Sequence, residues 1–291
     1  MDIHTLRLAL HGQPFGHTIH YHLSVPSTMP IARALAENAL EPSHLSGTVV
    51  VADEQTAGRG RLDRRWETPP GRALLVSFIV AGPHLPERPA QLPMIAGLAV
   101  LGAVRAICPT EDAGDSIWLK WSNDLVALRP DGPVKMAGML VESSLDSRGI
   151  RYAVLGIGIN VNQQANEFPA PRPGGLPPAS LHTLFGHEFA REALLLALCR
   201  SLSGLLSGPN RPSAKEIHTR WQGALINVGR MVTIHDSGTA GTQWQGRVVG
   251  TDMDGALLVE DATGQWVSVA VGDVSVALHD SWERPHPTPT D

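Results

Sequence analysis

Cysteine and aromatic residues are scarce in this sequence of 291 residues, which contains two cysteines, two tyrosines and five phenylalanines. Cys108 and Cys199 stand far apart, so the spacing indicates neither a zinc site nor a disulfide framework. Cys199 ends a leucine-rich helical pattern, which predicts a buried and unreactive thiol. His20 and His22 would share one face of a strand, but without a nearby cysteine or carboxylate they favour hydrogen-bonded or solvated histidines over a metal pair.

An excess of charge and long apolar runs are missing as well. The sequence has 23 basic and 28 acidic side chains, a net charge of −5, and this excludes a general nucleic-acid-binding protein. The longest apolar run that we identify, around residues 73–81, is too short to cross a bilayer as a helix. The start of the chain has no secretory signal pattern. We therefore expect a cytoplasmic protein with neither a nucleic acid nor a membrane as partner.

Hydrophobic periodicity predicts strands and helices in alternating groups. The expected strands are residues 19–25, 49–51, 74–80, 117–120, 125–128, 135–142 and 151–159, and the expected helices are 31–37, 92–107, 181–185, 190–206 and 214–221. We expect Ser27 and Thr28 to cap the first of these helices. Residues 166–178, rich in proline and glycine, are expected to form a loop.

The pattern changes near residue 226. Five short strands are expected at residues 231–234, 245–249, 256–260, 266–269 and 274–277, separated by turn residues, and such a series predicts a small barrel. We therefore expect two domains, residues 1–225 and 226–291, with a disordered proline-rich tail at 285–291.

Residues 55–66 form the most informative segment, Gln-Thr-Ala-Gly-Arg-Gly-Arg-Leu-Asp-Arg-Arg-Trp. Backbone N–H groups beside Gly58 and Gly60 can form an anion-binding nest, and arginine adds a fork that matches carboxylate or phosphate. Trp66 offers a face on which a base can stack. The segment predicts an anionic ligand with an aromatic ring, although a solvated surface turn would have the same composition.

Three further motifs occupy residues 119–125 (Leu-Lys-Trp-Ser-Asn-Asp-Leu), 134–142 (Val-Lys-Met-Ala-Gly-Met-Leu-Val-Glu) and 154–162 (Val-Leu-Gly-Ile-Gly-Ile-Asn-Val-Asn). In this order the four motifs resemble those of the biotin protein ligases, over residues 18–280. The resemblance implies an α+β fold: a mixed β-sheet with flanking helices, as in class II synthetases, and a C-terminal SH3-like barrel. It also implies that ATP activates biotin to biotinyl-5′-AMP, with Mg²⁺, before transfer to a lysine of a biotin carboxyl carrier protein.

The same resemblance implies roles for individual residues. The catalytic candidates are Arg59, Arg61, Lys120, Asp124 and Lys135. The biotin-binding candidates are Ser27, Thr28, Gln55, Gly58, Arg59, Gly60, Arg61, Lys135, Gly138 and Gly156. The ATP-binding candidates are Arg64, Trp66, Asn123, Ile159 and Asn160, and no residue is expected to bind a metal directly. Asp124 would orient Lys120 or accept a proton from the acceptor lysine.

Three positions depart from the pattern of the family. Met29 replaces an asparagine, Asp63 replaces a glycine and Ser122 replaces a proline, from which we expect an active enzyme with altered loop order and a higher KM for biotin or ATP. Only about twenty residues precede the first expected strand, too few for a helix-turn-helix domain. We therefore expect a ligase without a repressor role, and the sequence leaves a homodimer open.

Two other functions remain open on the sequence. A lipoate or octanoate protein ligase would share the fold and the activation of a carboxylate. A non-catalytic module that binds biotin or an adenylate would share the motifs. Each site residue also has a purely structural interpretation: Lys120 and Asp124 as a surface ion pair, Trp66 in the core, Asn160 closing a turn.

Overall fold

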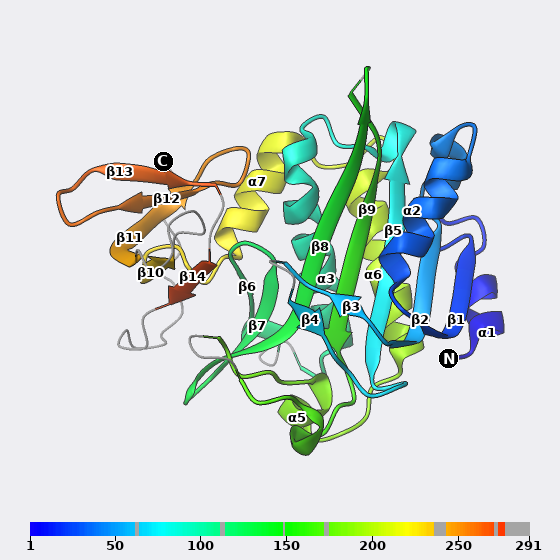
Figure 1. Ribbon diagram of the computed structural model, residues 1–291, viewed down its shortest axis with the longest axis horizontal. Coiled ribbons are helices and arrows are strands. Elements are labelled where there is room, and N and C mark those ends of the chain that lie inside the picture. The colour runs from blue at the N-terminus through cyan, green and yellow to red at the C-terminus, as the bar shows by residue number, and fades with distance from the viewer. Residues whose placement is uncertain are drawn as a thin grey trace.

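The structure is a computed structural model that describes residues 1–61, 64–110, 114–147, 149–171, 175–235 and 243–270, and the backbone of residues 273–276. A seven-stranded sheet forms its centre, and a smaller five-stranded sheet lies at one end of the molecule (Figure 1). The α+β class expected from the sequence is confirmed.

The large sheet has the strand order β1-β2-β5-β9-β8-β7-β6. Its strands are β1 (Ile19–Val25), β2 (Val49–Gln55), β5 (Ala73–Ala81), β6 (Ile117–Lys120), β7 (Asp124–Arg129), β8 (Gly132–Asp146) and β9 (Gly149–Asn160). β1 and β2 are parallel, and the other neighbouring pairs are antiparallel. The sheet is therefore mixed, as expected.

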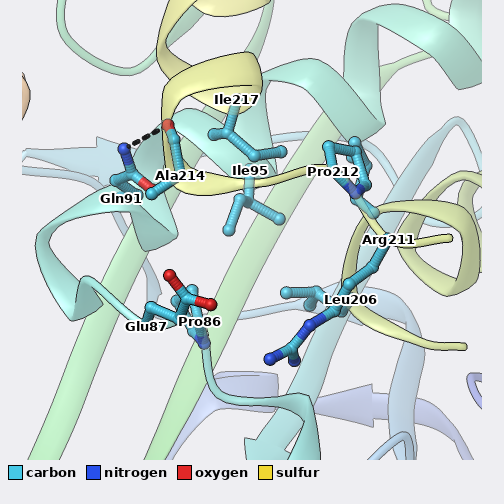
Figure 2. A pocket seen from close by; sticks show the side chains of 10 residues that line it. Pro86, Glu87, Gln91, Ile95, Leu206, Arg211, Pro212, Ala214 and Ile217 are labelled. Carbon is cyan, nitrogen blue, oxygen red and sulfur yellow. Dashed lines mark hydrogen bonds between the residues drawn. The ribbon is translucent and has the colours of Figure 1, made fainter. Parts of the chain in front are cut away.

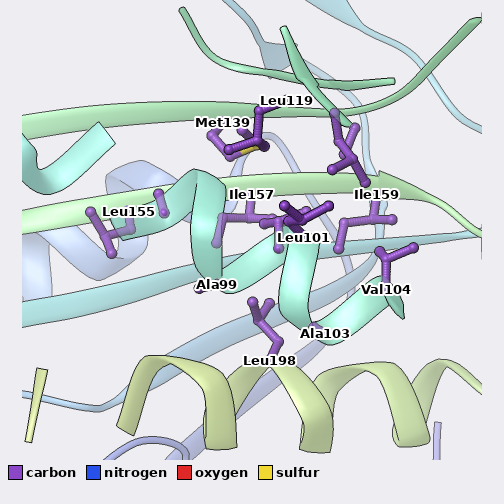
Figure 3. Close-up of a cluster of buried hydrophobic side chains, with 14 of the residues drawn as sticks. Ala99, Leu101, Ala103, Val104, Leu119, Met139, Leu155, Ile157, Ile159 and Leu198 are labelled. Carbon is purple, nitrogen blue, oxygen red and sulfur yellow. The ribbon is translucent and has the colours of Figure 1, made fainter. Parts of the chain in front are cut away.

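Helices cover the two faces of this sheet unequally. α3 (Leu92–Ile107) and α6 (Arg191–Leu206) pack on one face, where Leu155, Ile157 and Ile159 of β9 meet them (Figure 3). α2 (Thr28–Asn38) packs over β2, β5 and β9 on the opposite face. Because side chains alternate along a strand, Gly156 and Gly158 lie on the α2 face. α2 leaves part of that face uncovered, over β9, β8 and β7, so a functional segment can lie there.

The remaining helices are short or peripheral. They are α1 (Ile3–Ala9), α5 (Leu181–Phe185), α7 (Ala214–Gly223) and the 3-10 turns Pro42–Leu45, Gly82–His84, Pro89–Gln91 and Ala165–Glu167. The stretch Pro89–Ile107 is long and apolar enough to cross a membrane, but 61% of its most apolar window is buried inside the protein. It is longer than the run at residues 73–81 that the sequence singled out, and it packs as a core helix.

The smaller sheet has the order β13-β12-β11-β10-β14 and is antiparallel. Its strands are β10 (Met231–His235), β11 (Gln243–Thr251), β12 (Leu257–Glu260), β13 (Trp266–Val269) and β14 (Asp273–Val276). Among the described residues β13 and β14 are its two edges, so the structure confirms an antiparallel sheet and not a closed barrel. Trp121 joins it to the large sheet, because its indole N–H donates to the Gly255 carbonyl over 2.8 Å.

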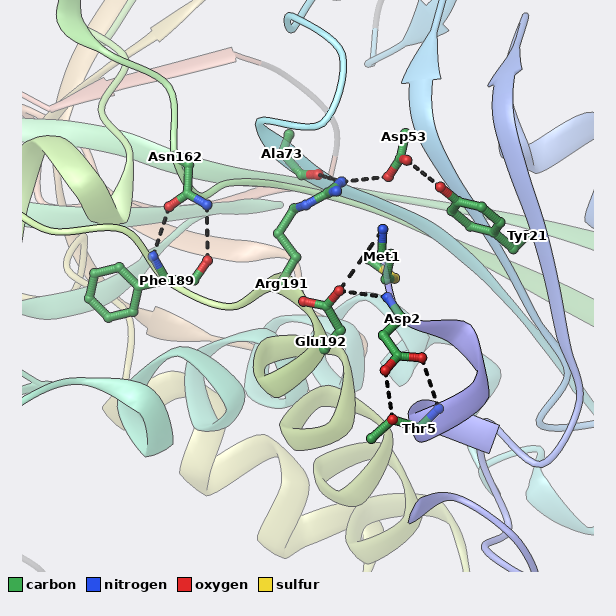
Figure 4. A network of polar contacts seen from close by, with 10 residues as sticks. All are labelled: Met1, Asp2, Thr5, Tyr21, Asp53, Ala73, Asn162, Phe189, Arg191 and Glu192. Carbon is green, nitrogen blue, oxygen red and sulfur yellow. Dashed lines mark hydrogen bonds and ion pairs between the residues drawn. The ribbon is translucent and has the colours of Figure 1, made fainter. Parts of the chain in front are cut away.

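A polar network ties the end of β2 to β1 and α6 (Figure 4). Arg191 Nη1 lies 2.7 Å from Asp53 Oδ1, and the Tyr21 hydroxyl donates to the other carboxylate oxygen. Burial, followed by the contact with Asp53, raises the pKa of Tyr21 to about 12. Burial alone would raise the pKa of Asp53, but the hydrogen bonds from Tyr21 and Arg191 outweigh it and lower that pKa. The strand that leads to Gln55 is thereby fixed at its end.

The expected strands and helices all occur within the described residues, with differences at their ends. β2 continues to Gln55, β8 and β9 form a longer hairpin than expected, and α1 was not expected. Cys199 is fully buried, as expected, and burial raises the pKa of its thiol to about 12. Asp63, residue 277 of the last expected strand and the tail at 285–291 lie outside the described residues.

Candidate active site

Three of the expected site residues, Lys120, Asp124 and Gly138, lie in one row across the large sheet, and Gly158 extends that row. Lys120 pairs with Asp124, Asp124 with Gly138, and Gly138 with Gly158. Neighbouring strands stand about 4.8 Å apart, so this row is about 14 Å long. Directly opposed residues share a face of the sheet, and here it is the face that α2 leaves open.

The Gly-Arg segment lies over this row as a small hairpin and not as the loop we expected. β3 (Gly58–Arg59) pairs with β4 (Arg65–Trp66), and both strands lie in front of β8 and β9 (Figure 1). A methyl group added to Gly158 would come within 2.8 Å of the Trp66 indole, and one added to Gly138 within 3.1 Å. The two glycines therefore form a flat floor for an aromatic ring.

Cations surround one end of this floor. Lys135 Nζ lies 2.6 Å from Asp124 Oδ1 and 5.8 Å from the centre of the Trp66 ring. Arg61 donates to the Ser122 hydroxyl and, over 3.4 Å, to Asn123 Oδ1. Ser122, a departure from the family pattern, thus acquires a contact of its own.

Lys120 shows that these cations lie within electrostatic reach of one another. Its side chain is buried, and burial is the main reason why its pKa is lowered. Asp124 opposes that shift, whereas Lys135, Arg64 and Arg61 add to it. Arg61, Arg64 and Lys135 therefore lie close enough to Lys120 to act on its charge. Arg59 is exposed and pairs in register with Arg65 on the hairpin.

Neutral polar groups occupy the other end of the site. Thr28 donates its backbone N–H to Gln55 Oε1 over 2.8 Å. Its hydroxyl lies 3.1 Å from the same oxygen and 2.7 Å from the Ser77 hydroxyl. Ser27 is the N-cap residue of α2, but its side chain makes no capping hydrogen bond. The expected capping is wrong, because the Thr28 hydroxyl turns to the sheet instead.

Ser77 was missed in the sequence, although a signal was present. It is the sole polar residue in the nine-residue strand Ala-Leu-Leu-Val-Ser-Phe-Ile-Val-Ala, and it is fully buried. A buried hydroxyl needs a partner, so its presence in an otherwise apolar strand indicates a specific contact. Ser77 pairs in register with Gly156, the residue above which Met29 lies.

Met29 fills the space beside this neutral end. A methyl group on Gly156 would come within 2.5 Å of the Met29 sulfur, and Met29 belongs to the apolar cluster between α2 and the sheet. The departure from asparagine thus places an apolar side chain against the glycine. Gly60 lies on the hairpin beside Arg64, and Gly58 lies beside the amide of Gln55.

Two residues assigned to the nucleotide are buried in different ways. The Ile159 side chain lies in the core beside α3, on the face of the sheet away from the site (Figure 3). Alternation along residues 156–160 puts Ile159 on the other face of the sheet from Gly158, so a contact with the nucleotide at this position stays a prediction that only the Ile159 backbone can meet. Asn160 lies on the correct face, but its amide donates to the Ala179 carbonyl over 3.1 Å.

A small cavity lies elsewhere, between α3, α6 and α7, with Gln91, Ile95 and Ile217 in its wall (Figure 2). Its volume of about 20 Å³ has room for about one water molecule. Among the described residues no group of three or more histidine, cysteine, aspartate or glutamate side chains could hold a metal ion.

The sequence is similar to those of known ligases. A model of the biotin/lipoate A/B protein ligase family matches residues 23–160. The bifunctional ligase/repressor BirA of Bacillus subtilis is 30% identical over 260 residues, which cover 89% of this chain and 74% of that protein. The biotin–[acetyl-CoA-carboxylase] ligase of Paracoccus denitrificans is 30% identical over 81% of this chain and 95% of its own length.

Solved structures show the same relationship. The biotin protein ligase from Aquifex aeolicus in complex with biotin and ATP superimposes with a TM-score of 0.68 and 28% identity, covering 89% of this chain and 98% of its own. Fold and relatives define an ATP-dependent ligase. The chain belongs to the biotin/lipoate A/B protein ligase family, and its resemblance to the biotin protein ligases is confirmed.

Proposed function

We infer that this chain is a biotin protein ligase, which forms biotinyl-5′-AMP from biotin and ATP and transfers biotin to a lysine of a protein. One observation carries this inference: a buried neutral end and a cationic end lie on one face of the sheet, with a glycine floor between them. A neutral ureido ring suits hydroxyl and amide side chains, whereas carboxylate and phosphate suit cations.

We propose that the first step joins two anions at the cationic end. The ureido ring would bind at Ser27, Thr28, Gln55 and Ser77, and the biotin carboxylate would point towards Lys135. A carboxylate oxygen attacks the α-phosphorus of magnesium-bound ATP, and the bond to pyrophosphate breaks. Two unit charges at ~4 Å repel by about 4 kcal/mol at an effective dielectric constant of about 20. Arg61, Arg64, Lys120 and Lys135 would offset that repulsion.

Aromatic and amide groups would hold the nucleotide. The Trp66 indole lies on the glycine floor, and its buried Nε1 has no hydrogen-bond partner among the described residues. A ligand acceptor would satisfy that N–H. We propose that Trp66, Asn123 and Asn160 face the adenosine, and that Arg59 closes over the ligand from the hairpin.

The second step would use the ion pair between Asp124 and Lys135. The ε-amine of the acceptor lysine attacks the acyl carbon of biotinyl-5′-AMP, a C–N bond forms, and AMP leaves as the C–O bond breaks. We propose that Asp124 accepts the proton released by the amine. Its carboxylate lies at the cationic end of the site, 2.6 Å from Lys135 Nζ. The acceptor would be a biotin carboxyl carrier protein.

The remaining features of the proposal concern the protein as a whole. We propose a catalytic domain at residues 1–225 and an SH3-like domain at 226–291, with Trp121 between them. We also propose a cytoplasmic enzyme with neither a nucleic acid nor a membrane as partner.

The direct test is acid-dependent exchange between ATP and labelled pyrophosphate, followed by transfer to a carrier domain. We expect biotin to support exchange and lipoate or octanoate not to, and we expect Lys135→Ala to abolish most of it. A higher rate with lipoate or octanoate would assign the chain to the other branch of the family. Binding of biotin without exchange would instead indicate a non-catalytic binding module.

A further inference from the structure

Gln163, three residues beyond the end of β9, is a buried polar residue outside the site described above. Its side chain is fully buried, and both ends of its amide are engaged. Nε2 donates to Asn160 Oδ1 over 2.8 Å, and Oε1 accepts the Val161 N–H over 2.8 Å. Its backbone carbonyl accepts the Ser180 hydroxyl over 2.6 Å. One residue thus joins the end of β9 to the segment around Ser180.

That segment in turn holds the backbone of Lys135. The Lys135 N–H donates to the Pro177 carbonyl over 2.8 Å, and the Ala179 N–H donates to the Lys135 carbonyl over 2.8 Å. β9 ends at Asn160, and its pairing with β8 begins beyond Lys135, at Ala137. Residues 177–179 therefore take the place of β9 beside Lys135.

We propose that Gln163 is a positioning residue for adenylate formation, which acts through Ser180 and residues 177–179 on Lys135; this rests on the proposed function. Lys135 carries the ion pair with Asp124, so the placement of its backbone sets where its ammonium meets the reacting anions. A supporting amide that is hydrogen-bonded at both its nitrogen and its oxygen holds such a group within a fraction of an ångström. Gln163 also fixes the orientation of the Asn160 amide, because Gln163 Nε2 donates to Asn160 Oδ1 and this oxygen must therefore face Gln163.

The biotin end is independent of this network. Thr28 on α2 contacts Gln55 on β2 and Ser77 on β5, and within the described part of the chain no hydrogen bond joins these three residues to Gln163. Loss of the Gln163 amide is therefore expected to act on chemistry and ATP while it spares biotin binding.

The test compares Gln163→Met with Gln91→Met in the full chain. Gln91 is a matched control, because it is equally buried and its amide donates to the Ala214 carbonyl over 2.9 Å, away from the site. We expect both variants to lower Tm, and Gln163→Met alone to lower kcat of biotin-dependent ATP–pyrophosphate exchange about 10- to 100-fold. The Kd for biotin should stay within about twofold, the change expected of a group outside that pocket.

Two results would overturn the proposal. One is a Gln163→Met enzyme with unchanged kcat and unchanged KM for ATP. The other is a Gln163→Met enzyme that loses biotin affinity by the same factor as kcat. If Gln163→Met fails to fold, Ser180→Ala removes the hydroxyl bond to the Gln163 carbonyl, together with the cap that this hydroxyl gives the Thr183 N–H at the start of α5. It is expected to give the same split, a few-fold in kcat. Wild-type protein that catalyses no exchange with any acid would overturn the proposed function first.

Discussion

The two ends of the site are built in opposite ways. At the neutral end, the short side chains of Thr28 on α2 and Ser77 on β5 are buried and bond to each other, and Thr28 also bonds to the half-buried Gln55 on β2. At the cationic end, long side chains lie on the edge half of the sheet and on the hairpin. The acidic side chain in direct contact with these cations is that of Asp124, which is ion-paired with Lys135.

This difference separates binding from chemistry. Short hydrogen-bonded groups lose little freedom when a ligand arrives, so the neutral end is organised in advance. Several cations that face few anions repel one another, and an incoming carboxylate or phosphate relieves that repulsion. Burial, and after it the repulsion from neighbouring cations, lowers the pKa of Lys120. Substitutions at the two ends should therefore have separable effects.

The largest effect is expected at the cationic end. Lys135→Ala removes the ammonium from the centre of the cluster, and we expect kcat for adenylate formation to fall by about 10²- to 10³-fold. Biotin affinity, measured by titration, should fall by no more than a few-fold, because the ureido ring keeps its contacts at the neutral end. A parallel loss of biotin affinity would show that the two ends are one unit.

A smaller effect, of the opposite kind, is expected from Thr28→Val at the neutral end. The substitution leaves the Ser77 hydroxyl without its partner at this position, and such a loss costs about 1–3 kcal/mol. We expect the KM for biotin to rise about tenfold while the KM for ATP stays constant. Thr48→Val is the matched control, because Thr48 is buried and its hydroxyl has no partner among the described residues. A rise in the KM for ATP instead would contradict the comparison.

The smallest effect concerns protons at Lys120. Its pKa is lowered in the ligand-free protein, so its ammonium is lost as pH rises through that lowered value. Bound phosphate favours the charged form, and ATP binding should take up as much as about one proton above that pKa. Calorimetry in buffers of different ionisation enthalpy measures this uptake. Lys120→Arg stays charged and should abolish it; equal uptake in that variant would assign the proton to another group.

Several parts of the site could be predicted from the sequence because they depend on local chemistry. The Gly-Arg segment, the lysines of the two hairpin motifs and the strand with glycines at 156 and 158 indicated an anion site beside a sheet. The alternation of side chains along β9 also predicts that Ile159 faces the core, although the motif at residues 154–162 associates it with the nucleotide. Ser77 was visible as a hydroxyl in an apolar strand.

Other parts depended on pairing between distant segments. The register of β7 with β8 brings Asp124 opposite Gly138, and the ion pair with Lys135 follows from it. The pairing of residues 177–179 with Lys135 depends on where β9 leaves the sheet. Neither is encoded in a local pattern, because a shift of one residue in register would turn each side chain to the other face.

The sequence alone determined the strands, most of the helices and the family, because periodicity and motif order are properties of neighbouring residues. Tertiary structure alone decided which of the expected residues share a surface, how the hairpin lies on its glycine floor, and that Gln163 supports Lys135. Contacts of this kind form between segments that meet only after the chain has folded, and their geometry is fixed by register and packing.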